Sequence, residues 1–168
     1  MLYQIMVVIH ILASVILVGG GFLLGTVAVP TIRKEVTPPP AGFKLIGQIG
    51  RRFRPISWTM IGILVVTGLY LMMDHWSVSF SDLLTGDGHF VRYLQAKVGF
   101  VGLAIALAAT HDFILGPRVA ERMQKALAAG GPIPQEVIGL RMRMLMLARL
   151  NGVVGIIIIV IAGLMIRP

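Results

Sequence analysis

The 168-residue chain contains no cysteine, and only 13% of its side chains are charged. The lack of cysteine excludes disulfides, thiolate metal sites and catalysis by a thiol. Soluble domains carry about 25% charged residues and about 45–50% apolar ones. Here 57% of the residues are hydrophobic, and the mean hydropathy is +0.89. This composition excludes an ordinary soluble domain and predicts an integral membrane protein.

Four long apolar runs account for the composition, at about residues 2–29, 56–73, 90–115 and 145–166. Each has roughly the 20 apolar residues that cross about 30 Å of hydrocarbon. The alternating ten-residue segments of a membrane β-barrel are absent. The first run follows no basic segment and is too long for a signal peptide, so we expect a permanent span. The sequence therefore predicts an all-α fold, a four-helix bundle forming one membrane domain over residues 1–168.

Proline and glycine mark the expected breaks between the spans. Pro30 is expected to end the first span and Gly116-Pro117 the third, because proline lacks the N–H that a helix interior needs. The basic segments 41–54 and 118–129 predict two short helices on the cytoplasmic membrane surface. The second of these is expected to end at Gly130-Gly131-Pro132.

The charges are distributed unequally between the connections. The loop between the second and third spans is acidic, with Asp74, Asp82 and Asp87. The other two connections are basic, with Arg33, Lys34, Lys44, Arg51, Arg52 and Arg54 in one and Arg118, Arg122, Lys125, Arg141 and Arg143 in the other. Lysine and arginine collect on the cytoplasmic side, so we predict that both termini lie outside, in a multi-pass protein of the bacterial cytoplasmic (inner) membrane. This topology explains the net charge of +8 without a nucleic-acid partner.

Ionisable side chains inside a span are costly and point to function. His10 lies eight residues beyond Leu2, about 12 Å below the outer end of its span. Lys97 lies seven residues into the third span, about 10 Å below the same surface. His111 and Asp112 fall near the inner end of that span. His10 and Lys97 are therefore expected at one level, and His10 and His111 are poor candidates to ligate one metal together.

Soft metal ligands accompany His10. Met6 precedes it by four residues and so shares its helix face, and His75 closes the second span. Imidazole and thioether groups suit copper and also serve haem iron. We therefore consider a copper or haem b centre with His10 as the first ligand and His75 or Met6 next. The alternative is that the methionines only fill apolar space.

Lys97 has two interpretations. Its long stem allows the ammonium to reach the membrane surface without any further role. Alternatively, its charge holds an anionic group such as a haem propionate, or relays a proton, beside the metal.

A second polar group is predicted at the inner side. Asp112 requires a cation, and the candidates are Arg52, Arg54 and Arg149. Asn151, one turn inside the fourth span, is expected to add a hydrogen bond. We interpret His111, Asp112, Arg149 and Asn151 as a structural cluster that locks three spans together.

Several stretches resemble the copper-resistance D family of bacterial membrane proteins. They are His10-Ile-Leu-Ala, Val18-Gly-Gly-Gly-Phe22, Arg51-Arg-Phe-Arg, Thr67-Gly68 and Tyr93-Leu-Gln-Ala-Lys97. More distantly, the chain is similar to HemJ-type protoporphyrinogen oxidases. That resemblance assigns supporting roles to Arg51, Arg52 and Lys97 and includes His111, but the Asn-Glu-x-Pro element of that type is Asn151-Gly-Val-Val here.

The function classes that remain open differ in their chemistry. The first is a membrane protein that handles copper or carries haem b for electron transfer. The second is a HemJ-like oxidoreductase of tetrapyrrole metabolism. The third is a non-catalytic accessory subunit of a respiratory or photosynthetic complex. All three share the lipid bilayer as surroundings, and each is compatible with self-association or a larger membrane complex. Because the classes include both an oxidoreductase and a non-catalytic subunit, the sequence does not decide whether the protein is an enzyme.

Overall fold

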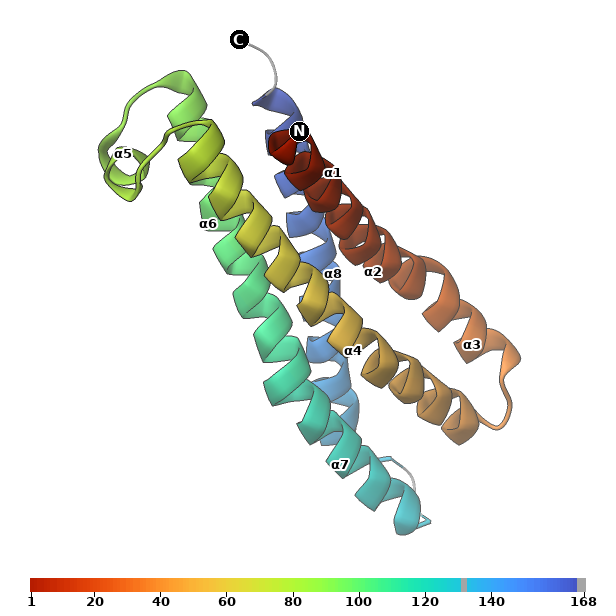
Figure 1. The fold of residues 1–168 in the computed structure, drawn as a ribbon. Helices are drawn as coiled ribbons and strands as arrows, with labels where there is room; N and C mark the ends of the chain where they lie inside the picture. Colours follow the sequence, from red (N-terminus) through yellow and green to blue (C-terminus); the bar gives the residue numbers. More distant parts are fainter. Residues whose placement is uncertain (131–132, 166–168) are drawn as a thin grey trace.

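The protein is a bundle of four long helical runs (Figure 1). In this computed structural model, residues 1–130 and 133–165 are described. The runs cover Leu2–Glu35, Pro40–His75, His89–Ala128 and Gln135–Leu164, each long and apolar enough to cross a membrane. The described residues contain no strand. The predicted all-α membrane fold with four spans is confirmed, whereas the predicted span end at Ile166 and the break at Gly131-Pro132 lie outside the described residues.

The first run is continuous through Pro30, so the prediction that this proline ends the span is wrong. It comprises α1 (Leu2–Ser14), the π-helical segment η1 (Val15–Gly19), α2 (Gly20–Leu23), η2 (Leu24–Ala28) and α3 (Val29–Glu35). Proline removes one hydrogen bond and crowds the carbonyl of the preceding turn. The wide π-helical turn η2 ends at Ala28, two residues before Pro30, so the backbone bonding is already offset there. The helix therefore accommodates the ring and continues.

The third run repeats this arrangement. It comprises α6 (His89–Ala109), the π-helical segment η4 (Thr110–Leu115) and α7 (Gly116–Ala128). Pro117 again lies two residues beyond the end of a π-helical turn. Gly116-Pro117 consequently does not end the helix, contrary to prediction. Residues 118–129 extend the third run instead of forming a separate surface helix.

The second run begins at the other predicted surface helix. Residues 41–54 form the first part of α4 (Pro39–Tyr70), which continues into η3 (Leu71–His75). Pro55 lies inside α4; the one backbone hydrogen bond that it removes is lost within a helix of 32 residues. The fourth run is α8 (Gln135–Leu164). Both segments predicted as separate surface helices are thus continuous with spans.

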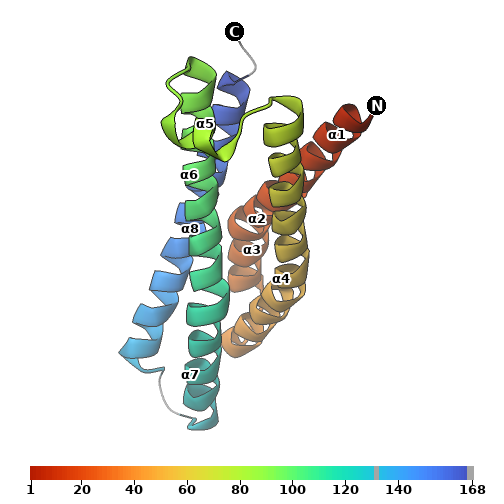
Figure 2. The ribbon, with the colours of Figure 1, turned by 60° about the vertical axis from the view of Figure 1, so that its left-hand side comes forward.

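The four runs pack as two pairs, α1 with α4 and α6 with α8 (Figures 1 and 2). The N-terminus and the loop that carries α5 (Phe80–Thr85) lie at one end of the bundle (Figure 1). We call this the acidic end, after Asp74, Asp82 and Asp87. The opposite end, where α3 turns into α4 and α7 approaches α8, is called the basic end. The position of each candidate residue along the bundle can therefore be given relative to these two ends.

Few side chains are buried, because the bundle is slender. The accessible surface is 10952 Å², against about 8,100 Å² for a compact soluble protein of this mass. Large apolar side chains are exposed along all four runs, which suits a lipid bilayer. One buried cluster lies near the acidic end, where Met72, Val78 and Leu94 pack with Trp76, Leu83, Phe90 and Met165.

The acidic loop is ordered by its own hydrogen bonds. The Ser79 hydroxyl accepts a bond from the Asp82 amide at 3.1 Å, and the Asp82 carboxylate accepts one from the Ser79 amide at 3.0 Å. This capping box satisfies amides at the start of α5 that lack helical partners. The hydrogen bond from the Ser79 hydroxyl lowers the pKa of Asp82 from its ordinary value. Gln95 of α6 donates to the Leu83 carbonyl at 2.8 Å and so fastens α5 to the bundle.

Candidate functional site

His10 meets α4 through a threonine hydroxyl. Its ring is half-buried on α1, and Nδ1 lies 2.7 Å from Oγ1 of Thr67. Thr67 is 4% exposed, the one polar residue counted as buried among those described. Its hydroxyl donates to the Ile63 carbonyl at 2.6 Å. A threonine hydroxyl has one hydrogen to donate, so towards His10 it acts as an acceptor, and Nδ1 carries the proton.

The hydrogen bond to Thr67 determines which nitrogen of the neutral imidazole carries the proton. With the proton on Nδ1, a neutral ring keeps a free lone pair on Nε2. Metal-binding histidines are commonly oriented in this way, with the nitrogen that does not bind the metal donating to a neighbouring oxygen. The Thr67 contact therefore engages Nδ1 and leaves Nε2 of His10 outside this hydrogen bond.

Gly68 allows the imidazole to lie against α4. A Cβ atom at this position would stand 3.4 Å from Cε1 of His10, an ordinary van der Waals distance, so the ring lies directly beside the α4 backbone. Thr67 and Gly68 together thus form the wall behind His10. The sequence pointed to this pair only through the family resemblance, because one threonine in an apolar span gives no other signal.

Lys97 of α6 supplies the charge next to this site. Its side chain is half-buried, and its ammonium lies within electrostatic range of the His10 ring. Among the described residues, Lys97 forms no ion pair and no side-chain hydrogen bond. Leu94, one turn away on the same helix, belongs to the buried cluster. Lys97 therefore has no charged or hydrogen-bonding partner in the described part of the chain.

The other two proposed ligands lie between His10 and the acidic end, Met6 on α1 and His75 at the end of η3. Met6 is half-buried one turn towards the acidic end. His75 is exposed and stacks on Tyr3, with ring centroids 3.7 Å apart and planes inclined by 23°. Tyr3 precedes His10 by seven residues, which is about 10 Å along a helix. Within residues 1–130 and 133–165, no three His, Asp or Glu side chains gather as a metal site.

A second polar cluster lies nearer the basic end. Asp112 receives a hydrogen bond from Trp58 Nε1 at 3.0 Å, and its other oxygen lies 2.8 Å from Nδ1 of His111. The Phe113 ring contacts Trp58 at 5.1 Å and the Arg54 guanidinium at 5.7 Å. Trp58 of α4 joins the α1–α4 pair to the α6–α8 pair through this hydrogen bond.

The remaining members of the predicted inner cluster do not meet Asp112. Arg149 is exposed and forms no ion pair within the described part of the chain. Asn151 has a buried side-chain oxygen, Oδ1, for which the described residues supply no hydrogen-bond donor. Arg51 and Arg52 are exposed on α4. The geometry thus joins His111 and Asp112 to Trp58 and places Arg54 over the adjacent Phe113 ring. Within the described residues, Arg52, Arg149 and Asn151 form no hydrogen bond or ion pair with Asp112.

The two histidine sites occupy different levels of the bundle. His10 contacts α4 at Thr67, and the His111–Asp112 pair contacts it at Trp58. These positions are nine residues apart, about 13 Å along the helix. No single ion bridges that distance, so His10 and His111 belong to separate sites.

Comparison with known proteins gives one match. A protein-family model described as Copper resistance protein D matches residues 47–165. The match includes Thr67, Gly68 and Lys97, whereas His10 precedes it. No curated protein and no solved structure matches the chain.

Proposed function

The chain belongs to the copper resistance protein D family, and on this basis we propose that it handles copper ions in the membrane, with Nε2 of His10 as the principal ligand atom. The observation that carries the proposal is the hydrogen bond between His10 and Thr67, which leaves Nε2 free. Copper is the substrate in this account. Imidazole and thioether groups bind it well, and methionine favours Cu(I).

Met6 supports the same proposal as a second donor. It lies on the His10 face of α1, one turn towards the acidic end. Beyond Met6, His75 is exposed at the level of Tyr3. These three side chains form a series of copper ligands that leads from the acidic end towards His10. We infer that copper passes between the bundle surface and His10 along this series.

Lys97 distinguishes copper from haem. Its ammonium repels a bound cation, so copper handling requires that ligand binding overcome this repulsion. In a haem site the same ammonium would attract a propionate. Haem held by His10 and His111 is not supported, because His10 contacts α4 at Thr67, whereas His111 is linked to α4 through Asp112 at Trp58, about 13 Å away along the helix. The copper proposal therefore predicts tighter binding when the charge of Lys97 is removed.

The topology is part of the proposal. We orient the basic end towards the cytoplasm of a bacterial cell, in the inner membrane, because lysine and arginine collect on that side. The His10 site then lies nearer the periplasm. Because the chain has no cysteine, single cysteines at Asp87 and at Glu121 can be labelled in intact cells with an impermeant maleimide. Labelling is expected at position 87 alone, and labelling at position 121 alone would reverse the orientation.

Copper binding by the purified protein tests the central proposal. Protein in detergent micelles is titrated with Cu(I) against a coloured chelator. His10→Ala is expected to lower the affinity at least tenfold, whereas the matched control His111→Ala leaves it unchanged. Size-exclusion profiles verify that both variants remain folded.

Three outcomes would contradict the proposal. One is equal loss of copper binding in both variants, and another is loss in His111→Ala alone. The third is a red native preparation that has a Soret band and binds no copper, which would identify a haem protein. The proposal is supported if the native protein is colourless and if copper binding is lost in His10→Ala but not in His111→Ala.

A further inference from the structure

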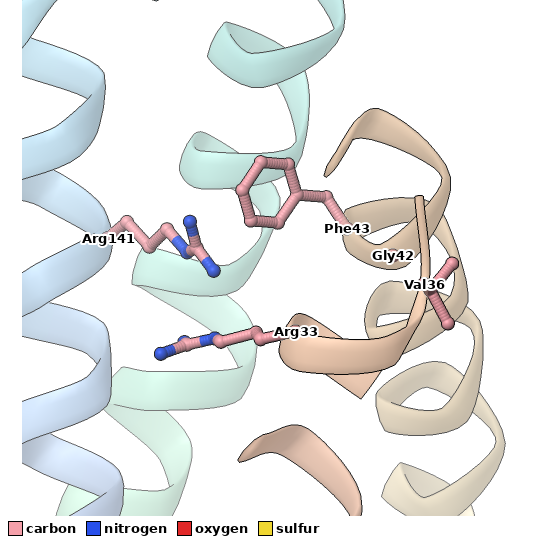
Figure 3. A pocket seen from close by; sticks show the side chains of 5 residues that line it. All are labelled: Arg33, Val36, Gly42, Phe43 and Arg141. Atoms are coloured by element: carbon pink, nitrogen blue, oxygen red, sulfur yellow. The ribbon is translucent and has the colours of Figure 1, made fainter. Parts of the chain in front are cut away.

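A cavity at the basic end has two arginines and no acidic partner. It has a volume of about 210 Å³ and is lined by Arg33, Val36, Gly42, Phe43 and Arg141. Figure 3 shows the guanidinium groups of Arg33, from α3, and Arg141, from α8, pointing into the same space. The cavity therefore lies where the first, second and fourth runs meet.

The acidic side chains closest in sequence are engaged elsewhere. Glu35 pairs with Lys34 at 3.8 Å, and Glu136 pairs with Arg122. Within the described ranges, neither Arg33 nor Arg141 forms an ion pair or a side-chain hydrogen bond. Two guanidinium groups that share a cavity repel each other, and a bound anion relieves that repulsion. The two arginines of the cavity thus have no negatively charged partner among the described residues.

Phe43 holds one of the arginines in position. The Arg141 guanidinium lies over the Phe43 ring at 4.0 Å from its centroid. Such stacking fixes the plane of the guanidinium and leaves its N–H edge free for a planar, two-point contact with a phosphate. Gly42 belongs to the first turn of α4, where the helix dipole is positive. The residues around the cavity are therefore arranged for an anion.

We propose that Arg33, Arg141 and Phe43 form a binding site for a phosphate group, with the headgroup of an anionic phospholipid as its source. The volume lies below the about 300–1,000 Å³ of pockets for drug-sized ligands, so it suits a headgroup phosphate better than a whole metabolite. All three residues lie where their helices reach the basic end, at the level of lipid headgroups. Basic pockets between spans are known to bind anionic headgroups.

Lipid titration of the full chain in detergent tests the site. The probe is a fluorescent phosphatidylglycerol, displaced by unlabelled phosphatidylglycerol, by phosphatidylcholine or by inorganic phosphate. Arg141→Gln is expected to weaken binding about tenfold, as loss of a charge-assisted hydrogen bond does, and Arg33→Gln similarly. Arg143→Gln is the matched control, since Arg143 is exposed, follows on the same helix and does not line the cavity. Phe43→Leu is expected to weaken binding less than Arg33→Gln or Arg141→Gln does.

The competitors identify the source of the phosphate. Displacement by phosphatidylglycerol but not by inorganic phosphate supports the lipid headgroup. Equally effective displacement by inorganic phosphate supports the phosphate site but replaces the lipid with a soluble anion. Phosphatidylcholine that competes as well as phosphatidylglycerol would overturn the proposal. Equal binding by Arg141→Gln and Arg143→Gln, with unchanged thermal unfolding, would overturn it too.

Discussion

Thr67 is the residue whose replacement tests the account of His10 most sharply. Thr67→Val keeps the shape of the side chain and removes the oxygen that lies 2.7 Å from Nδ1 of His10. The lost hydrogen bond costs about 1 kcal/mol, and a buried donor left without an acceptor costs about 1–3 kcal/mol. The ring is then free to rotate and to exchange its proton between the two nitrogens.

The effect on copper should exceed the effect on folding. Removal of a group that orients a metal ligand typically lowers metal affinity 10- to 100-fold, which corresponds to about 1.4–2.7 kcal/mol. We expect Thr67→Val to lower Cu(I) affinity by this factor while the protein stays folded. Thr67→Ser retains the hydroxyl and is expected to stay within about threefold of the wild type.

Two measurements check this prediction. A competition titration gives the Cu(I) affinity, and the ¹⁵N chemical shifts of the imidazole report which nitrogen carries the proton. The wild-type ring should be protonated on Nδ1. A wild-type ring protonated on Nε2 instead, or a Thr67→Val protein with unchanged affinity, would refute the argument from hydrogen bonding.

Three further predictions concern the acidic loop and the charge near His10. Gly86→Ala should destabilise the protein by about 1–3 kcal/mol, because its Cβ would stand 2.5 Å from the Asp82 carbonyl oxygen; Gly88→Ala, with its nearest contact at 3.9 Å, should unfold at the wild-type temperature, and equal unfolding temperatures for the two variants would contradict the clash. Because hydrogen bonding from Ser79 lowers the pKa of Asp82, the capping contact should be fully present above the ordinary aspartate value of 3.8 and be lost as the pH falls through the lowered pKa; the Ser79 amide signal in an NMR titration measures this, and a transition above pH 5 would exclude it. Lys97→Leu, which removes the charge without adding a copper ligand, should tighten Cu(I) binding in the competition titration, and weaker binding would show that the ammonium serves an anion instead.

The spans were predictable because hydropathy depends only on composition along the chain. The sequence could not show that Pro30 and Pro117 lie within continuous helices. Proline excludes one backbone hydrogen bond, but a π-helical turn that ends two residues before it lets the helix continue, and that turn depends on packing. The segments 41–54 and 118–129 were taken for separate helices for the same reason.

The candidate site was only partly visible in the sequence. His10 and Lys97 stand out because ionisable groups are rare in spans. Their neighbours were missed, since Thr67 and Trp58 are uncharged and ordinary in a membrane helix. Only the pairing of α1 with α4 and the approach of α6 reveal that these two residues hold His10 and Asp112. Partners of this kind depend on helix rotation, which hydropathy does not determine.

The coordination of bound copper tests the central claim most directly. X-ray absorption at the copper edge, recorded on Cu(I)-loaded protein, should show the scattering of an imidazole ring together with sulfur. The account predicts that His10→Ala abolishes the imidazole signal and that His111→Ala preserves it. An imidazole signal that survives in His10→Ala would contradict the claim that Nε2 of His10 binds the metal.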